Sequence, residues 1–339
     1  MKIKTLPVEQ AVGKIISHDL TLIDPEKGFK GARFKKGHRI GEEDIPLLLR
    51  MGKSNIAFLE LAPDEVHEDD AALLLGRRMK GEGLELQGPS EGRCALCADR
   101  DGLLFYRDED IDFINADPDW IFATGPNKTA IARGTVAAVF RVGPLVVKRG
   151  QVDRALSASP LSVLPWIPYP TALVTTGREI FDGTVKDAFF PKLQEKIAPY
   201  GATLLGNTVC PDDASAIRSA AASWLGKGAR VVLCTGGMSV DVDDRTPQAI
   251  ASLCDEVVFR RIPVIPGANL MLARKGDSLV LGVPASAAFA KRTSLDILLD
   301  RIYAGLPPTG EEVRRWGRGG LCRDCLSCSY PGCTFSTRG

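Results

Sequence analysis

The sequence predicts an α/β protein: a doubly wound, mostly parallel sheet preceded by a smaller α+β domain. Two observations support this fold class. In the second half of the chain, short apolar, β-branched runs alternate with amphipathic helical patterns, which is typical of a parallel sheet covered on both faces. In the first half, short strand patterns and glycine turns surround a few helical segments. That pattern favours an α+β arrangement with a mixed or antiparallel sheet.

The bulk composition is that of an ordinary globular protein. The chain has 339 residues, enough for two or three domains, and a formal net charge of +1 with 25% charged residues. It shows no clustered basic face for nucleic acid, no apolar run long enough to span a membrane and no signal peptide. We therefore expect a cytoplasmic protein with neither kind of partner. Its nine cysteines are then thiols or metal ligands rather than disulfides.

The first region, residues 1–156, is expected to form the α+β domain. Helical patterns occur at 42–51 and 64–80, and the second has acidic residues in its first turn and basic residues in its last, which suits the helix dipole. Strand patterns occur at 54–59, 93–98 and 135–142. The following segment, 157–170, contains four prolines and predicts an extended, semi-rigid linker.

The second region, residues 171–306, is expected to form the α/β domain. Its strand patterns lie at 172–176, 203–209, 230–234, 256–259 and 278–282. Its helical patterns lie at 184–198, 214–225, 247–254 and 285–304. In a parallel sheet the carboxyl ends of neighbouring strands share one edge, and ligands bind outside that edge. Polar residues that follow these strands are therefore candidates for a site.

The strand pattern that ends near Cys234 leads directly into a double glycine. Gly236 and Gly237 are followed by Ser239, by a loop with three aspartates, and by Thr246 at the start of a helical pattern. Glycine allows the backbone to approach an anion closely, and carboxylates can hold a hard cation such as Mg²⁺ against that anion. The order strand, glycine turn, polar loop and helix therefore predicts an anion site with a possible magnesium ion.

Three further motifs follow strand patterns in the same way. The first is Thr176-Gly177-Arg178-Glu179-Ile180, with Asp187 in the first turn of the expected helix. The second is Pro211-Asp212-Asp213, and the third is Gly282-Val283-Pro284-Ala285. An aspartate such as Asp213 is a favoured helix N-cap, so a structural role is as plausible for it as a functional one. Asp187 can equally be a solvated acid at a helix start.

In this order, the four motifs resemble those of the molybdopterin-binding domain of molybdenum-cofactor biosynthesis proteins, over roughly residues 168–306. The resemblance implies a molybdotransferase that binds molybdopterin or its adenylylated form, molybdate and Mg²⁺. It implies catalytic roles for acidic residues at matching positions, namely Asp213, Asp244, Asp187 and Glu179. It implies cofactor-binding roles for Thr176, Gly177, Gly236, Gly237, Ser239, Thr246, Gly282 and Pro284. A homo-oligomer, either dimer or trimer, fits the family.

Two departures from the family pattern keep other functions open. Arg178 stands at a position that is often acidic in the family, and no counterpart of the transferases' C-terminal barrel is visible. The first alternative is a non-catalytic module that carries, senses or delivers the cofactor, with a molybdoenzyme as client. The second is an unrelated nucleotide-binding enzyme that uses the same fold.

The last segment, residues 307–339, is polar and rich in cysteine. Cys322, Cys325, Cys328 and Cys333 fall within twelve residues. Such sets bind Zn²⁺ or an iron–sulfur cluster, and redox thiols in a disordered tail or a disulfide pair are the alternatives. So short and polar a segment buries little apolar surface. We therefore expect metal–ligand bonds to order it as a compact lobe.

Overall fold

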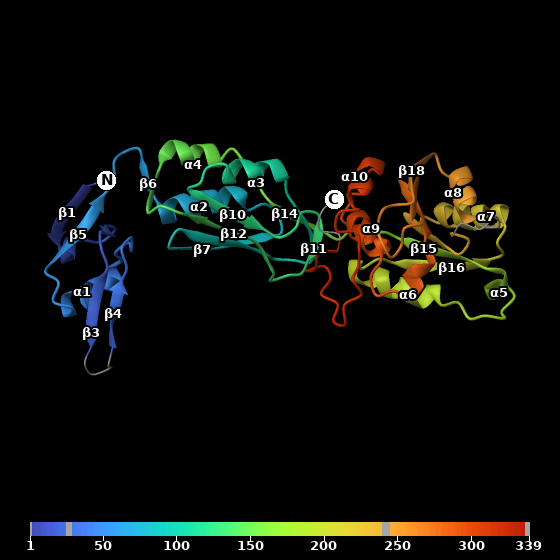
Figure 1. The fold of residues 1–339 in the computed structure, drawn as a ribbon, viewed down its shortest axis with the longest axis horizontal. Helices are drawn as coiled ribbons and strands as arrows, with labels where there is room; N and C mark the ends of the chain where they lie inside the picture. Colours follow the sequence, from blue (N-terminus) through green and yellow to red (C-terminus); the bar gives the residue numbers. More distant parts are fainter. Residues whose placement is uncertain (1, 25–28, 239–244, 336–339) are drawn as a thin grey trace. The chain divides into compact units, whose positions relative to one another are not determined.

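The computed structural model describes residues 2–24, 29–238 and 245–335 (Figure 1). Contacts between residues divide the chain into two units. Unit 1 comprises the described residues of 1–98, 106–125 and 134–162, and unit 2 comprises those of 99–105, 126–133 and 163–339. The boundaries expected from the sequence, at 156, 170 and 306, stay a proposal.

Unit 1 is built from antiparallel strands. Its strands are β1 (Lys2–Pro7), β2 (Ile15–Ile16), β3 (Leu20–Asp24), β4 (Phe29–Phe34), β5 (Asn55–Glu60), β6 (Glu65–His67), β7 (Leu84–Ser90), β8 (Arg93–Ala98), β10 (Trp120–Thr124), β12 (Val136–Val142) and β13 (Val146–Lys148). They form sheets in the orders β1-β5-β2, β10-β12-β8-β7, β3-β4 and β13-β6. Every registered pair among them is antiparallel. The expected α+β region with an antiparallel sheet is thereby confirmed.

The helices of unit 1 are short. They are η1 (Val8–Gln10), η2 (Glu42–Asp44), α1 (Ile45–Arg50), α2 (Glu68–Met79), α3 (Asp108–Asn115) and α4 (Arg149–Ala155). The prediction of one helix over 64–80 was wrong at its start, because residues 65–67 pair with β13 as β6. The His67 ring then caps α2, with Nδ1 accepting the Asp69 N–H at 3.3 Å.

Unit 2 is organised around a six-stranded sheet. Its strands, in the order in which they lie, are β16 (Leu204–Cys210), β15 (Thr171–Thr176), β17 (Val231–Thr235), β20 (Ser278–Val283), β19 (Met271–Lys275) and β18 (Glu256–Arg260). The first four are parallel to one another, and β19 is antiparallel to both β20 and β18. The expected mostly parallel sheet is confirmed, although β19 was not predicted.

Helices cover both faces of this sheet. They are α5 (Arg178–Phe181), α6 (Phe189–Ile197), η3 (Ala198–Tyr200), α7 (Ala214–Gly226), α8 (Thr246–Leu253), η4 (Ala285–Ala288), α9 (Ser294–Tyr303) and α10 (Gly310–Arg315). Alternate residues of the strands point to opposite faces, so Leu173 and Leu233 pack with α6 and α9. Val174 and Val232 pack with α7 and α8 on the other face. This two-layered covering confirms the doubly wound fold.

Two helices of unit 2 are shorter than predicted, each because a side chain caps it late. The helix expected over 184–198 begins at Phe189, where the Asp187 carboxylate accepts backbone N–H groups. The helix expected over 285–304 divides into η4 and α9. Thr293 and Asp296 form a capping box that starts α9 anew.

A small sheet in the order β11-β9-β14 completes unit 2; these strands are Thr129–Ile131, Gly102–Phe105 and Ser162–Pro165. Thus part of the proline-rich segment is a strand. Lys128, beside β11, and Arg301 of α9 both form salt bridges with Glu312, at 2.8 and 2.7 Å. Burial alone would raise the pKa of Glu312, but these two cations lower it to about 2. The Glu312 carboxylate therefore ties α10 to two other segments.

The tail contributes to the core of unit 2 instead of forming a separate lobe. Val313, Trp316 and Phe335 are buried in the same cluster as α6 and α9. The Tyr330 hydroxyl donates a hydrogen bond to the buried Asp300 carboxylate. The expectation that metal bonds alone order this segment therefore misses the apolar side chains that anchor it.

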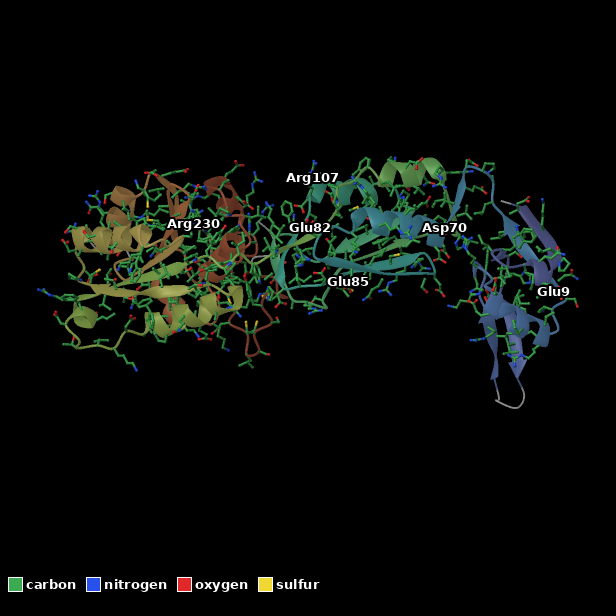
Figure 2. All side chains as sticks on the ribbon, turned by 180° about the vertical axis from the view of Figure 1, so that it is seen from behind. Glu9, Asp70, Glu82, Glu85, Arg107 and Arg230 are labelled. Carbon is green, nitrogen blue, oxygen red and sulfur yellow. The ribbon has the colours of Figure 1, made fainter. Side chains whose placement is uncertain are left out.

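Charged side chains of both signs lie on the surface of each unit (Figure 2). In unit 1, Asp70 pairs with Arg39 at 2.5 Å, and in unit 2 Arg230 lies 3.6 Å from Asp277. Both pairs are exposed, so each contributes little to stability. Among the described residues, no helix combines the length and apolarity needed to cross a membrane.

Candidate functional site

The four parallel strands of unit 2 end side by side. In their register, Thr175 lies beside Thr235, Thr176 beside Cys210, and Thr235 beside Val283. From β15 the chain passes to β16 on one side and then to β17 on the other. The edge next to β15 is thus a topological switch point, where sheets of this kind bind ligands.

The loop after β17 opens with a glycine turn that tolerates no side chain. Gly236 and Gly237 have φ values of +83° and +53°. A Cβ on Gly236 would collide with the Thr176 carbonyl, and one on Gly237 would lie 3.1 Å from Thr246 Oγ1. The buried Thr246 hydroxyl donates a hydrogen bond to the Gly236 carbonyl at 2.8 Å. Thr246 therefore holds the turn in place.

A cavity of about 320 Å³ lies against this turn. Its described lining comes from three loops at the strand ends and consists of Gly236, Gly237, Met238, Gly267, Ala268, Asn269, Pro284, Ala285 and Ser286. Sequence reasoning missed the loop at 267–269, for which the Pro266-Gly267 pair was the available signal. Gly282 does not line the cavity; its missing side chain makes room for Met238, whose Sδ would lie 2.6 Å from a Cβ there.

Asp187 lies at the same edge, at the centre of a polar cluster. Its Oδ1 accepts the N–H groups of Phe189 and Phe190, at 2.8 and 3.2 Å. Its Oδ2 accepts from the Thr175 hydroxyl at 3.0 Å and from Asn207 Nδ2 at 3.2 Å. Neither Thr175 nor Asn207 was among the candidate site residues. A carboxylate offers about four acceptor positions, and these four hydrogen bonds use them. Asp187 therefore connects β15, β16 and the start of α6.

Asp213 is the N-cap of α7, which was one of the two roles considered for it. Its Oδ1 accepts from the backbone N–H groups of Ser215 and Ala216 and from the Ser215 hydroxyl. The hydrogen bond from the Ser215 side chain, followed by that from Ala216, lowers the pKa of Asp213. The capping role therefore accounts for one carboxylate oxygen.

The preceding residue, Asp212, faces the glycine turn. Its Oδ2 accepts the Arg178 N–H at 3.3 Å. Its Oδ1 lies 3.6 Å from the position that a Cβ on Gly237 would occupy. Asp212 belongs to the motif seen in the sequence but was not among the candidates. The carboxylate of Asp212 therefore contacts the surroundings of the turn, whereas that of Asp213 accepts hydrogen bonds from Ser215 and Ala216.

The remaining candidates differ in what the structure shows of them. Gly177, with φ +148°, is the N-cap of α5, and Glu179 in α5 is exposed. Ser239 and Asp244 lie outside the described residues. The edge therefore brings together Thr176, Gly177, Gly236, Gly237 and Pro284. Thr246 and Gly282 stabilise the turn indirectly, through the hydrogen bond to Gly236 and the space left for Met238.

Three hydroxyl groups at this edge are buried without a hydrogen-bond partner among the described residues. They are Thr176 Oγ1 and Thr235 Oγ1 at the strand ends, and Ser286 Oγ in the wall of the cavity. Burial raises the pKa of the neighbouring Cys210 to about 11 and that of Cys234 further. These two thiols therefore stay protonated at neutral pH, and of the three hydroxyl groups only that of Ser286 belongs to a residue that lines the cavity.

The described residues do not form a magnesium site. No group of three or more His, Cys, Asp or Glu residues within 2–24, 29–238 and 245–335 is arranged to hold a metal ion. Asp187 accepts hydrogen bonds on both carboxylate oxygens, and Asp213 accepts them on one. The expected third acid, Asp244, lies outside the described residues.

The comparison with protein families agrees with this geometry. Residues 172–304 match the family described as "Probable molybdopterin binding domain". Residues 172–304 of this chain belong to that family. The match contains the glycine turn, Asp187 and the lining of the cavity, and it confirms the resemblance inferred from the motifs. Residues 5–60 match a second family, described as a domain of unknown function.

Curated relatives extend the similarity over part of the chain. A "Molybdopterin molybdenumtransferase" of Synechococcus elongatus is 27% identical over 131 residues, which are 36% of this chain and 32% of that protein. A "CinA-like protein" of Amoebophilus asiaticus is 29% identical over 93 residues, 27% of this chain and 22% of that protein. The matched parts thus span about a third or less of these relatives.

Solved structures show the same partial likeness. The molybdopterin biosynthesis enzyme MoaB of Thermus thermophilus has 21% sequence identity and a TM-score of 0.35, covering 41% of this chain and 98% of its own. The molybdopterin biosynthesis Mog protein of Mycobacterium ulcerans has 17% identity and a TM-score of 0.35, covering 40% of this chain and 96% of its own.

Proposed function

We propose that the cleft next to the glycine turn binds molybdopterin, and that the protein acts in molybdate insertion into molybdopterin or its adenylylated form. The observation that carries the proposal is the left-handed turn Gly236-Gly237 beside a cavity of about 320 Å³, inside the stretch that belongs to the molybdopterin-binding family. Glycines in this conformation expose backbone to an anion such as the terminal phosphate of the ligand.

The other groups of the cleft suit the pterin part of that ligand. A pterin ring presents several hydrogen-bond donors and acceptors. Asn269 lies in the wall of the cavity, as does Ser286, whose hydroxyl has no hydrogen-bond partner among the described residues. Thr246 and Asp187 would act as positioning residues, since the first holds the turn and the second joins α6 to β15 and β16. Asp212 is the described carboxylate that faces the turn, and we assign no step to magnesium.

A cofactor carrier is the second candidate function. It is favoured by the hydrogen bonds of Asp187 and Asp213 to backbone N–H groups at helix starts, which give both carboxylates a structural role. Such a protein would bind the cofactor in the same cleft and release it to a molybdoenzyme. The insertion enzyme and the carrier would therefore bind the same ligand, and only the enzyme would convert it to a product.

Binding is tested on the full-length protein by titration with molybdopterin, followed by its fluorescence. Gly237→Ala should weaken binding at least tenfold, because a Cβ there enters the turn. Gly276→Ala is the matched control: Gly276 has φ +54°, nearly that of Gly237, but lies in the β19–β20 turn with nothing within 4 Å of its Cβ position. Equal affinities of the two variants would contradict the assignment of the cleft.

Turnover is tested separately from binding. The wild-type protein is incubated with adenylylated molybdopterin, molybdate and Mg²⁺, and the product is measured by its ability to activate a cofactor-free molybdoenzyme. Product formation that depends on the protein supports insertion. Tight binding without product supports the carrier.

A further inference from the structure

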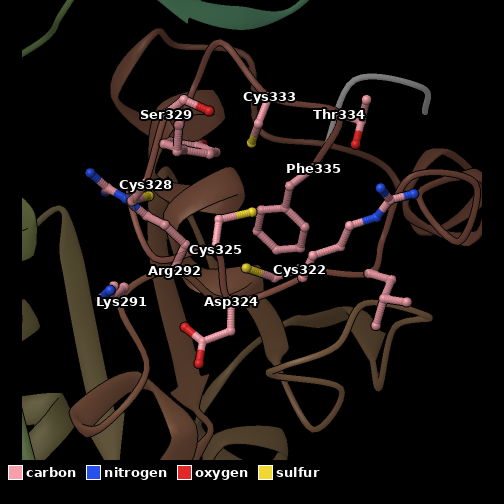
Figure 3. A pocket seen from close by; sticks show the side chains of 13 residues that line it. Lys291, Arg292, Cys322, Asp324, Cys325, Cys328, Ser329, Cys333, Thr334 and Phe335 are labelled. Carbon is pink, nitrogen blue, oxygen red and sulfur yellow. The ribbon is translucent and has the colours of Figure 1, made fainter.

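The cysteine-rich tail is a second chemical feature of unit 2, and its side chains do not line the cleft described above. The thiols of Cys322, Cys325, Cys328 and Cys333 all line one cavity (Figure 3). That cavity has a volume of about 50 Å³, far below the several hundred Å³ of a site for an organic cofactor. A space of this size with four cysteines among its thirteen lining residues suits a metal ion better than an organic cofactor.

Two of the four cysteines are anchored on the domain core. Cys322 and Cys333 are half-buried and pack against the same cluster as Phe335, which is buried. The Cys322 N–H also donates a hydrogen bond to the Ile265 carbonyl at 2.8 Å. These two thiols are therefore held in place by contacts that do not depend on a metal.

The other two cysteines lie on an exposed loop. Cys325 and Cys328 are exposed and belong to a segment without helix or strand, and Leu326 between them is fully exposed. Because Leu326 is already fully exposed, a movement of this loop toward Cys322 and Cys333 costs no burial of that side chain. Such a movement is required, because no three of the described cysteines are already close enough to hold a metal ion.

The charges around the cavity favour a thiolate centre. Lys291, Arg292 and Arg323 line it, and Asp324 is the one acid in its lining. Arg292 is fixed there by a salt bridge to Asp296 at 3.0 Å and by the Tyr330 ring, 4.8 Å from its guanidinium carbon. Four thiolates around Zn²⁺ leave a net charge of about −2, and an iron–sulfur cluster with four thiolates is also anionic. Lys291 and Arg323 can offset this charge, together with Arg292, which shares its charge with Asp296.

We propose that Cys322, Cys325, Cys328 and Cys333 bind one metal centre through four thiolates, with the exposed pair closing onto the anchored pair. On binding, each thiol loses its proton to solvent and forms a bond to the metal. This site is independent of the cofactor cleft and of the function proposed for it.

The test is metal analysis of the full-length protein purified without oxygen, and again after incubation with Zn²⁺ and removal of excess ion. About one zinc per chain without colour identifies a zinc site. Iron with acid-labile sulfide and visible absorption identifies a cluster. Less than about a tenth of a metal per chain in both preparations overturns the proposal and leaves a thiol tail.

Variants assign the ligands. Cys325→Ser and Cys328→Ser change exposed side chains, so the fold should persist, and each should lower the metal content at least fivefold. Cys254→Ser is the control, since Cys254 is a half-buried thiol outside the tail, and it should keep the metal. Full metal content in the double variant of Cys325 and Cys328 also overturns the proposal.

Discussion

The Thr246 hydroxyl donates a hydrogen bond to the carbonyl oxygen of Gly236, at 2.8 Å. This bond joins the first turn of α8 to the glycine turn after β17. The Thr246 side chain is fully buried, and Gly236 packs so tightly against Thr176 that it has no room for a Cβ. The position of the proposed phosphate site is therefore set by contacts that lie beneath it.

Replacement of Thr246 by Val should loosen this turn while preserving the shape of the side chain. We expect the free energy of unfolding to fall by about 1–2 kcal/mol, because the carbonyl of the half-buried Gly236 loses its donor. We also expect the affinity for molybdopterin to fall several-fold. Ser252→Ala is the control, since it removes a hydroxyl-to-carbonyl bond on the same helix, to Ala249. Wild-type affinity in Thr246→Val would show that the bond does not position the site.

Replacement of Asp187 by Asn should separate a positioning role from a catalytic one. An amide cannot accept hydrogen bonds on both terminal atoms, so the link between α6 and the strand ends weakens. We expect a loss of about 1–3 kcal/mol in the free energy of unfolding, with a parallel loss of cofactor affinity. Asp182→Asn, an exposed residue of the same connection, should change neither. Slow insertion with unchanged stability and affinity would instead make Asp187 a catalytic residue.

The carboxyl group of Asp300 predicts a pH dependence of stability. The Tyr200 hydroxyl donates to its Oδ1 at 2.7 Å, and the Tyr330 hydroxyl of the tail donates to its Oδ2. Burial raises the pKa of Asp300 from 3.8 to about 6, despite these hydrogen bonds. The folded state therefore holds this proton more tightly than the unfolded state, so its contribution to stability is complete below about pH 4 and is lost as pH rises through about 6.

The measurement is the difference in free energy of unfolding between wild type and Asp300→Asn, from denaturant titrations followed by tryptophan fluorescence. This difference should shift in favour of wild type by about 3 kcal/mol between pH 7 and pH 4. The variant Asp277→Asn, whose side chain is 88% exposed, should show no comparable shift. A flat difference for Asp300→Asn would mean that this carboxyl titrates normally.

Arg323 gives a prediction for the metal site. If its charge offsets that of the thiolate centre, Arg323→Gln should weaken metal affinity roughly fivefold, and more at low ionic strength. Competition with a chromophoric chelator measures this affinity. Arg318→Gln changes an exposed arginine that does not line the cavity. An equal loss in both variants would point to the overall charge of the protein rather than to Arg323.

The local pattern of the sequence predicted the parallel strands well. Strands β15, β16, β17 and β20 begin and end within one residue of their expected bounds, because each is a short apolar run closed by glycine or proline. Helix starts were less predictable. The start of α6 depends on hydrogen bonds to Asp187, and the start of α9 depends on Thr293. In both places the apolar pattern of the sequence continues across the start of the helix, so the pattern alone does not locate it.

The parts of the site that sequence reasoning missed are those made by distant segments. Asn207 meets Asp187 because β16 lies beside β15. The loop at 267–269 reaches the cavity because β19 returns antiparallel next to β20. The local pattern of apolar and polar residues does not indicate either contact, because each joins segments that are far apart in the sequence. The glycine turn was predictable, because a double glycine after a buried strand indicates a backbone conformation that other residues rarely adopt.

The most direct test of the central claim is a pair of titrations of the wild-type, full-length protein, one with molybdopterin and one with its dephosphorylated form. If the turn Gly236-Gly237 holds the terminal phosphate, molybdopterin should bind with a stoichiometry near one per chain, and loss of the phosphate should weaken binding at least tenfold, or about 1.4 kcal/mol. Equal affinity for the two ligands would contradict the phosphate assignment. Absence of saturable binding by either would contradict the function itself.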